Sequence, residues 1–294
     1  MAIFEGAGVA LVTPFAKTGE INYEKLEELV EEQIAGGTDC IVAMGTTGES
    51  ATTTEEEHLQ AIRFICQAVK GRAPVIAGTG SNCTRTAVEL SVEAQEAGAD
   101  GVLLVSPYYN KATQKGLKAH FTAVAEAIKI PAILYNIPSR TGVNIAPETI
   151  AGLCRDVKNI VGVKEASGDF GAIATLLNLS DGNVDVYSGN DDQVVPMLAL
   201  GAKGVISVLS NVAPRETHDM CAEFFKGNVE ASRAIQLKAM PLIKALFCEV
   251  NPIPVKAAMN LMGKNVGEPR LPLTVMEPAH QEILKKAMKD FGIL

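Results

Sequence analysis

A lysine at the end of a short apolar run is the residue that points most directly to chemistry. Lys164 follows residues 160–163, whose apolar character and length predict a buried strand, 160–164. Strand side chains alternate, so Lys164 shares a face with Ile160 and Gly162. If that face is the interior, burial disfavours the ammonium and yields the neutral amine that attacks a ketone. The structural alternative is a lysine that pairs with Glu165 or extends to the rim.

Other polar side chains end or follow apolar runs elsewhere in the chain. Tyr135 closes one such run and offers a phenol. Thr46 and Thr47 lie in the glycine-flanked segment 45–50, whose N–H groups and hydroxyls are suited to bind a carboxylate. Arg140 is able to hold a second carboxylate with two parallel hydrogen bonds. Each also has a plain alternative: a rim tyrosine, a tight turn with a cap, and a surface arginine.

Other kinds of site have little support in the sequence. The six cysteines are scattered without a CxxC pair, which favours reduced thiols over a disulfide framework or a zinc site. Residues 78–80 only approach a phosphate-binding glycine motif. We expect no metal and no organic cofactor. The histidines fall within predicted helices and not at strand ends: His58, His120, His218 and His280.

Eight short apolar runs alternate with longer amphipathic segments, and this order positions the polar residues at strand ends. Two of the amphipathic segments are predicted helices, 22–35 and 54–69, and the second opens with a capping box at Thr54. Eight β-then-α units predict the α/β class and a (β/α)8 TIM barrel, which carries its chemistry at the carboxyl ends of its strands. A doubly wound open sheet is the alternative, but it usually has fewer strands. The predicted strands are 8–13, 40–44, 74–77, 101–106, 132–136, 160–164, 184–188 and 204–208.

The last part of the chain is predicted to be helical. Three helical segments without strands follow residue 226: 229–247, 255–262 and 277–291. We therefore predict a barrel over 1–225 and a C-terminal helical region over 226–294 that packs beside it.

Composition and charge limit the classes of partner. The 294 residues are 47% hydrophobic and 20% charged, which suits a large buried core. The net charge of −8 argues against binding to nucleic acid or an anionic membrane, since both require a basic surface. The N-terminal segment lacks the pattern of a signal peptide, and no apolar run has the length of a membrane span. We expect a cytoplasmic enzyme.

Five motifs together resemble one known family. They are GTTGES at 45–50, PYYN at 107–110, YNIPSRTG at 135–142, GVKEASGD at 162–169 and SGND at 188–191. In order and spacing they resemble the 4-hydroxy-tetrahydrodipicolinate synthase family, within the superfamily that includes N-acetylneuraminate lyase. The resemblance runs from residues 8–15 to the segment 251–256 and so covers almost the whole chain.

The resemblance implies a reaction in lysine and diaminopimelate biosynthesis. Lys164 would form a Schiff base with pyruvate, and the resulting enamine would attack the aldehyde of L-aspartate 4-semialdehyde. Tyr135, Thr46 and Tyr109 would relay protons, with Tyr109 supplied by a neighbouring subunit. A tyrosine with a pKa of about 10 is a poor base at neutral pH, so a hydrogen-bonded relay is physically sensible.

The resemblance also implies binding residues and an assembly. Thr46 and Thr47 would hold the pyruvate carboxylate, and Arg140 would hold that of the aldehyde. Gly189 and the carbonyl of Ile206 would line the pocket. No cofactor is implied, because the lysine itself is the electron sink. The expected assembly is a homotetramer made of two tight dimers.

Two other functions are weighed against this one. A pyruvate-dependent sugar-acid aldolase, such as N-acetylneuraminate lyase, shares the lysine and the tyrosine. Thr47, Tyr109 and residues 139–141 favour the synthase. A catalytically inactive pyruvate-binding or scaffold protein is expected to lack Lys164 or Tyr135, and both are present.

Feedback by lysine is expected to be absent. Regulated members bind lysine at the dimer interface, near segments that match 50–58, 82–86 and Tyr108. The chain departs from their pattern with Glu55 where histidine is usual and Thr86 where glutamate is usual. A buried ammonium needs a nearby anion, and Thr86 offers only a hydroxyl. The chain keeps Ser50, Ala51, His58, Asn82 and Tyr108.

Overall fold

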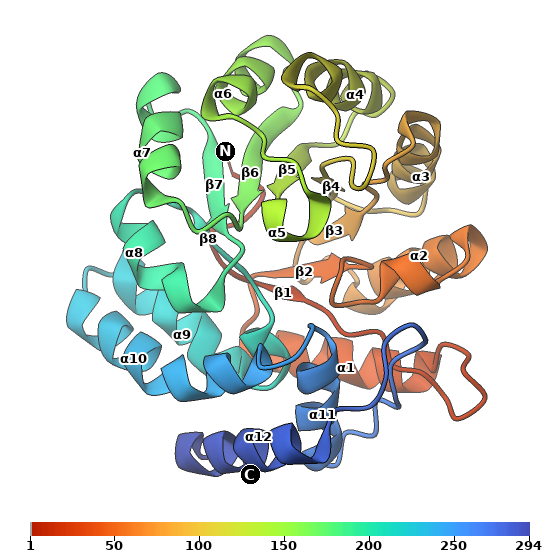
Figure 1. Ribbon diagram of the computed structural model, residues 1–294, viewed down its shortest axis with the longest axis vertical. Coiled ribbons are helices and arrows are strands. Elements are labelled where there is room, and N and C mark those ends of the chain that lie inside the picture. The colour runs from red at the N-terminus through yellow and green to blue at the C-terminus, as the bar shows by residue number, and fades with distance from the viewer. Residues whose placement is uncertain (1) are drawn as a thin grey trace.

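A closed barrel of eight parallel strands forms the centre of the protein. The computed structural model describes residues 2–294 and places each strand beside its neighbours in sequence order (Figure 1). The predicted TIM barrel with C-terminal helices is therefore confirmed. The strands are β1 (Gly6–Ala10), β2 (Cys40–Ala43), β3 (Val75–Gly78), β4 (Gly101–Val105), β5 (Ala132–Asn136), β6 (Ile160–Glu165), β7 (Asp185–Ser188) and β8 (Gly204–Ser207).

The prediction for the first strand is wrong in its bounds. Residues 8–13 were expected, but β1 begins at Gly6 and ends at Ala10. Gly6 pairs with Gly204 of β8, and a Cβ on Gly204 would lie 1.8 Å from the Gly6 carbonyl oxygen. A Cβ on Gly6, whose φ is 118°, would lie 2.1 Å from Asp39 Oδ2. Glycine is therefore needed at both positions where the barrel closes, and glycine carries no hydrophobic signal. The other seven strands lie within one residue of their predicted bounds.

Helices surround the barrel, and their first turns follow the capping signals in the sequence. The Asn22 side chain accepts a hydrogen bond from Lys25 N at the start of α1. Thr54 and Glu57 form the predicted capping box at the start of α2. The helices are α1 (Tyr23–Gly36), α2 (Glu55–Val69), α3 (Thr84–Glu96), α4 (Gln114–Glu126), the short α5 (Pro138–Thr141), α6 (Pro147–Asp156), α7 (Phe170–Leu179), α8 (Val194–Ala199) and α9 (Pro214–Phe225). Three short 3-10 helices are η1 (Ser50–Thr52), η2 (Asp191–Gln193) and η3 (Leu209–Asn211).

The barrel interior is filled with side chains at its amino-terminal end. Phe4, just before β1, stacks on Tyr187 of β7 with 4.4 Å between the ring centroids. The Tyr187 hydroxyl donates to the Phe4 carbonyl oxygen at 2.8 Å. These rings join an interior cluster that comprises Ala10, Cys40, Val42, Ile76, Leu103, Ile133, Tyr135 and Ile206.

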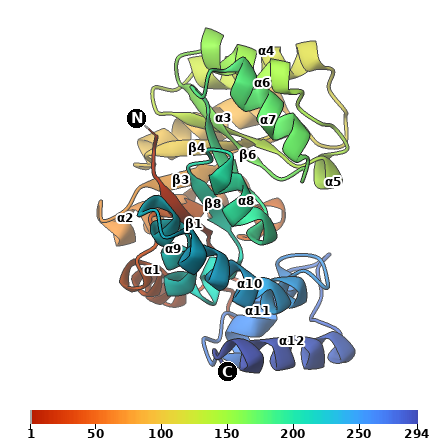
Figure 2. The same ribbon diagram turned by 90° about the vertical axis from the view of Figure 1, so that its left-hand side faces the viewer.

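The last part of the chain forms three helices that gather at one side of the barrel (Figure 2). They are α10 (Val229–Leu246), α11 (Ile253–Leu261) and α12 (Pro278–Phe291). The predicted start of α11 at residue 255 is two residues late, because Pro254 belongs to its first turn, where the fixed φ of proline is favourable. Within residues 2–294, no helix combines the length and apolar character needed to cross a membrane.

Candidate active site

Lys164 lies near the carboxyl end of β6 and points into the barrel. Its register partner on β5 is Tyr135, and each residue is 6% exposed. The Lys164 Nζ atom is 4.4 Å from the centroid of the Tyr135 ring. Glu165 does not pair with Lys164: its carboxylate accepts from Asn136 Nδ2 at 3.0 Å and from Ser167 N at 2.7 Å. The structure therefore has the interior lysine of the functional interpretation.

Burial adjusts the protonation of this lysine. Loss of solvation lowers the pKa of Lys164 to about 8; the Asp191 carboxylate opposes this shift, and the Arg140 guanidinium adds to it. Among residues 2–294, no carboxylate lies within ion-pair distance of Nζ. At pH 7 roughly one lysine in ten is then a neutral amine, compared with a negligible fraction for a solvated lysine. The neutral amine is the form of lysine that can attack a carbonyl group.

Tyr135 is shifted in the opposite direction. Burial raises the pKa of Tyr135 to about 12, although Arg140 and the Thr46 hydroxyl act to lower it. The phenol is thus protonated at neutral pH. It can donate a proton or pass one along a relay, but it is not a free phenolate base.

The turn after β2 presents hydrogen-bond donors to the same space. Thr47 is 2% exposed, and its hydroxyl oxygen accepts from Asn251 Nδ2 at 3.0 Å. Within the described chain, the N–H groups of Thr46 and Thr47 have no hydrogen-bond partner, whereas that of Gly48 donates to Gly45 O. Free N–H groups at a strand-to-helix turn are suited to a carboxylate.

One cavity of about 520 Å³ at the carboxyl end of the barrel joins these groups. Its walls include six of the eight residues that the sequence nominated: Lys164, Tyr135, Thr46, Thr47, Arg140 and Gly189. Apolar side chains such as Val42, Leu103 and Val208 line the space between them. An apolar pocket with a few convergent polar groups is typical of a binding site for a small molecule.

Gly189 makes room for the lysine. A Cβ at this position would lie 2.7 Å from the Ala166 Cβ and 3.2 Å from the Lys164 Cε. A side chain here would clash with Ala166 and press on the Lys164 side chain.

Two nominated residues do not line the cavity in this single chain. Tyr109 is 91% exposed and has a φ of 72°, a conformation that few residues other than glycine adopt. Its neighbour Tyr108 does line the cavity. Ile206 is buried on β8 within the interior cluster.

Asn251 is a site residue that sequence reasoning missed. It lies in the cavity wall, donates to Thr47, and through its carbonyl oxygen accepts from the Arg140 guanidinium at 3.0 Å. Its Oδ1 atom is buried without a partner in residues 2–294. The only signal was its place in the segment 251–256, which resembles the family but follows no predicted strand.

Asp191 was also assigned no role. Its carboxylate is buried on η2, and Oδ2 accepts from the backbone N–H groups of Val208 and Leu209, each at 3.0 Å. Burial raises the pKa of Asp191, while these donors and Lys164 lower it. Its position in the SGND motif was the available signal.

The remaining titratable groups are held in other ways. The four histidines lie on helices, as predicted. His58 lines the cavity, but its Nε2 is 2.8 Å from the Gly78 carbonyl oxygen, and burial lowers its pKa. All six cysteines are free. In residues 2–294, no three His, Cys, Asp or Glu side chains are grouped to hold a metal ion.

Comparisons with known proteins agree on one family. The sequence profile described as the dihydrodipicolinate synthetase family matches residues 3–291. A curated relative from Lachnoclostridium phytofermentans, named 4-hydroxy-tetrahydrodipicolinate synthase, is 59% identical over 294 residues, which is 100% of each chain. A crystal structure of the dihydrodipicolinate synthase from Acinetobacter baumannii, complexed with pyruvate, has a TM-score of 0.96 at 45% identity over 99% of both chains. The DHDPS structure from Cyanidioschyzon merolae with lysine bound has a TM-score of 0.97 at 42% identity over 100% of both chains.

Proposed function

This chain belongs to the dihydrodipicolinate synthetase family, and we propose that its reaction begins when Lys164 forms a Schiff base with pyruvate. The chain is a lyase that makes 4-hydroxy-tetrahydrodipicolinate in lysine biosynthesis. The observation that carries the proposal is the buried Lys164 amine beside the Tyr135 phenol in the wall of the cavity.

The chemistry follows from this pair. The neutral Nζ attacks the C2 carbonyl carbon of pyruvate, and the carbonyl oxygen leaves as water after it receives protons by way of Tyr135. The resulting iminium draws electrons from the neighbouring methyl group, which loses a proton and becomes an enamine carbon. That carbon attacks the aldehyde of L-aspartate 4-semialdehyde. The amino group of the aldehyde substrate then attacks C2, closes the ring and expels the lysine. No metal or organic cofactor is needed, because the iminium is the electron sink.

Proton movement is assigned to a relay. Tyr135, Thr46 and Tyr109 of a neighbouring subunit carry protons between the site and solvent. The high pKa of Tyr135 supports a relay, since a phenol with a pKa of about 12 passes a proton on more readily than it keeps a negative charge. The exposure of Tyr109 is consistent with a residue that serves another chain.

Binding roles are assigned by charge. The free N–H groups and hydroxyls of Thr46 and Thr47 hold the pyruvate carboxylate. Arg140, at the mouth of the cavity, holds the carboxylate of the aldehyde. Gly189 and the carbonyl of Ile206 complete the pocket. A relay that uses Tyr109 of a neighbouring subunit requires an oligomer, and the proposed assembly is a homotetramer of two dimers. The proposed location is the cytoplasm.

Borohydride reduction tests the nucleophile. With pyruvate present, it should attach a reduced pyruvyl group to Lys164 and abolish activity, as peptide mass mapping will show. Lys164→Ala should be neither labelled nor active. Lys203→Ala, which removes the lysine that immediately precedes β8, is the matched control and should behave like the wild type. Labelling at another lysine, or full activity in Lys164→Ala, would refute the proposal.

A further inference from the structure

A buried ion pair joins the C-terminal helical region to the turn that carries Thr46 and Thr47. Lys256 on α11 donates from Nζ to Glu49 Oε1 at 2.8 Å, and each side chain is 1% exposed. Glu49 follows Thr47 by two residues in the same turn. Lys256 is 207 residues from Glu49 in the sequence, and it is linked through the Glu49 side chain to the turn that is proposed to bind the carboxylate.

Both charges have further partners. Lys256 Nζ also donates to the Glu268 carbonyl oxygen at 3.1 Å and lies 4.2 Å from the centroid of the Phe15 ring. The second carboxylate oxygen of Glu49 accepts from Arg270 N at 2.9 Å. The other ion pairs within residues 2–294 all have at least one partly exposed member. Removing two charges from water is costly, so this pair is poorly explained as a device for stability alone.

The turn that this pair anchors has an unfavourable backbone conformation. Met44 and Glu49, which flank residues 45–48, have φ angles of 53° and 56°. Residues other than glycine rarely adopt positive φ angles, and such a backbone conformation persists only where the surrounding structure holds it. The Gly48 carbonyl oxygen accepts from the Thr13 hydroxyl at 2.7 Å, which fixes the middle of the turn. Glu49 fixes its end.

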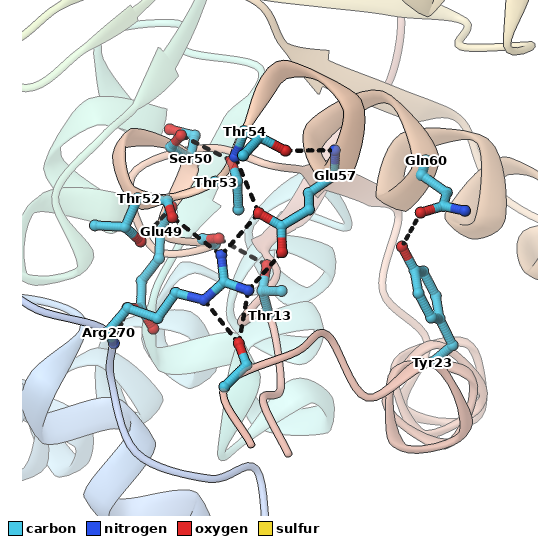
Figure 3. Close-up of polar contacts among 12 residues, drawn as sticks. Thr13, Tyr23, Glu49, Ser50, Thr52, Thr53, Thr54, Glu57, Gln60 and Arg270 are labelled. Carbon is cyan, nitrogen blue, oxygen red and sulfur yellow. Dashed lines mark hydrogen bonds and ion pairs between the residues drawn. The ribbon is translucent and has the colours of Figure 1, made fainter. Parts of the chain in front are cut away.

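Arg270 holds the same segment from the other side (Figure 3). Its guanidinium donates to both oxygens of Glu57, at 2.6 and 3.0 Å, and to the carbonyl oxygens of Gly19 and Thr52. The loop that supplies Arg270 N to Glu49 is thereby fixed against the start of α2. Lys256 and this loop each hold one oxygen of the Glu49 carboxylate, and together they fix its position.

We propose that Lys256 is a positioning residue for pyruvate binding, which acts through Glu49 to hold the Thr46–Thr47 turn in its receptive conformation. The inference rests on the proposed function, which places the pyruvate carboxylate on this turn. Without Lys256, the Glu49 carboxylate is a buried charge that lacks its cation. The turn then lowers its free energy by moving Glu49 toward water. The N–H groups of Thr46 and Thr47 then no longer converge on one point.

Three variants test the role. Lys256→Met removes the cation, and the double variant Glu49→Gln/Lys256→Met removes both charges at similar volume. The control is Lys264→Met, because Lys264 pairs with Glu32 and so also joins the C-terminal region to the barrel helices, but away from the turn. For each we measure the thermal midpoint, kcat, the KM for pyruvate, and borohydride trapping with pyruvate or with acetone, a ketone that lacks a carboxylate.

Lys256→Met should raise the KM for pyruvate about tenfold to a hundredfold with a much smaller change in kcat, as expected when a binding group moves by about 1 Å. Trapping of pyruvate should weaken while that of acetone stays the same. The double variant should recover thermal stability, since no unpaired charge remains buried, but it should keep the raised KM. Lys264→Met should match the wild type in KM.

Other outcomes overturn the inference. A pyruvate KM within about twofold of the wild type in a folded variant would show that the pair does not act on binding. Equal losses of trapping with pyruvate and with acetone would show that the pair has a general structural role. Failure of both Lys256 variants to fold would show the same. If wild-type Lys164 is not trapped with pyruvate, the proposed function fails and this inference with it. A trapped wild type with unchanged variants overturns this inference alone.

Discussion

Lys164 and Tyr135 lie side by side on β6 and β5, with the amine nitrogen 4.4 Å from the centre of the phenol ring. The same desolvation acts on them in opposite directions. It lowers the pKa of Lys164 to about 8 and raises the pKa of Tyr135 to about 12. At neutral pH the site therefore combines an amine that can lose its proton with a phenol that keeps one, as acid–base chemistry requires.

The pH dependence of Schiff-base formation should report the lysine pKa. Because only the neutral amine attacks, the rate of trapping with pyruvate and cyanoborohydride should rise with pH and reach half its maximum near pH 8. Asp191→Asn should move the midpoint to lower pH, since the Asp191 carboxylate raises the pKa of Lys164. Arg140→Gln should move it to higher pH. A lysine peptide controls for the reductant, and a wild-type midpoint near the ordinary value for lysine would contradict the assignment.

Arg140 should discriminate between the two substrates. Its guanidinium is exposed and donates to the Asn251 carbonyl oxygen, so it is free to turn toward a carboxylate at the mouth of the cavity. Arg140→Ala should raise the KM for the aldehyde about tenfold to a hundredfold, the value of a hydrogen bond to a charged group. Pyruvate trapping should change little when it is measured well above its pH midpoint, where Lys164 is neutral with or without Arg140. Arg140→Lys should recover part of the loss, because it restores charge without the planar fork. An equal effect on both substrates would refute the assignment.

Tyr109 should act in a neighbouring subunit. Inactive Lys164→Ala and inactive Tyr109→Phe chains, mixed and allowed to exchange, should regain activity, because some sites then hold both residues. Tyr108→Phe is the control for a tyrosine that lines the cavity of its own chain, and its mixture with Lys164→Ala should gain nothing from exchange. Hybrids that stay inactive after exchange is confirmed by mass would count against a shared relay.

Lysine should not inhibit the enzyme at moderate concentrations. Ser50, Ala51, Glu55, His58, Thr86 and Tyr108 all line the cavity, but Thr86 brings no charge, and the Glu55 side chain is exposed to solvent. A missing ion pair weakens binding by about one to three orders of magnitude.

The reverse change gives the sharper test of this expectation. Thr86→Glu should make the enzyme sensitive to L-lysine, and Thr86→Gln, of similar shape but neutral, should not. Enzyme rates at increasing L-lysine, with D-lysine as control, will measure this. Half-inhibition of the wild type below the millimolar range would show that another group supplies the anion.

Local patterns were sufficient for most of the barrel and for the centre of the site. Strand-length apolar runs located seven strands to within one residue. Lys164 lies in the interior, but the expectation that Ile160 shares its face is wrong: the register between β5 and β6 shifts at Val161, and Ile160 packs in the outer cluster. Periodicity failed at β1, because Gly204 is required by the closeness of the Gly6 backbone and Gly6 by the Asp39 side chain, and neither by hydrophobic burial.

Contacts between distant segments account for what the sequence did not reveal. Asn251 and Lys256 reach the turn at 45–50 from about 200 residues away, and no local pattern records such a partner. Tyr109 presents a different limit. Its sequence motif suggests a role, but a site shared between chains depends on an assembly that one chain does not contain.

The stack of Phe4 on Tyr187 closes one end of the barrel and so determines from which end small molecules reach the site. Because side chains fill the amino-terminal end of the barrel, Lys164 is approached from the cavity at the other end. The first molecule to enter occupies the deepest position, and the second can only rest above it. In the proposed reaction, pyruvate therefore binds before the aldehyde, and the water released on Schiff-base formation leaves by the route through which the aldehyde enters. An aldehyde molecule that binds first blocks the access of pyruvate to Lys164. An excess of the aldehyde should therefore slow turnover, and an excess of pyruvate should relieve this inhibition.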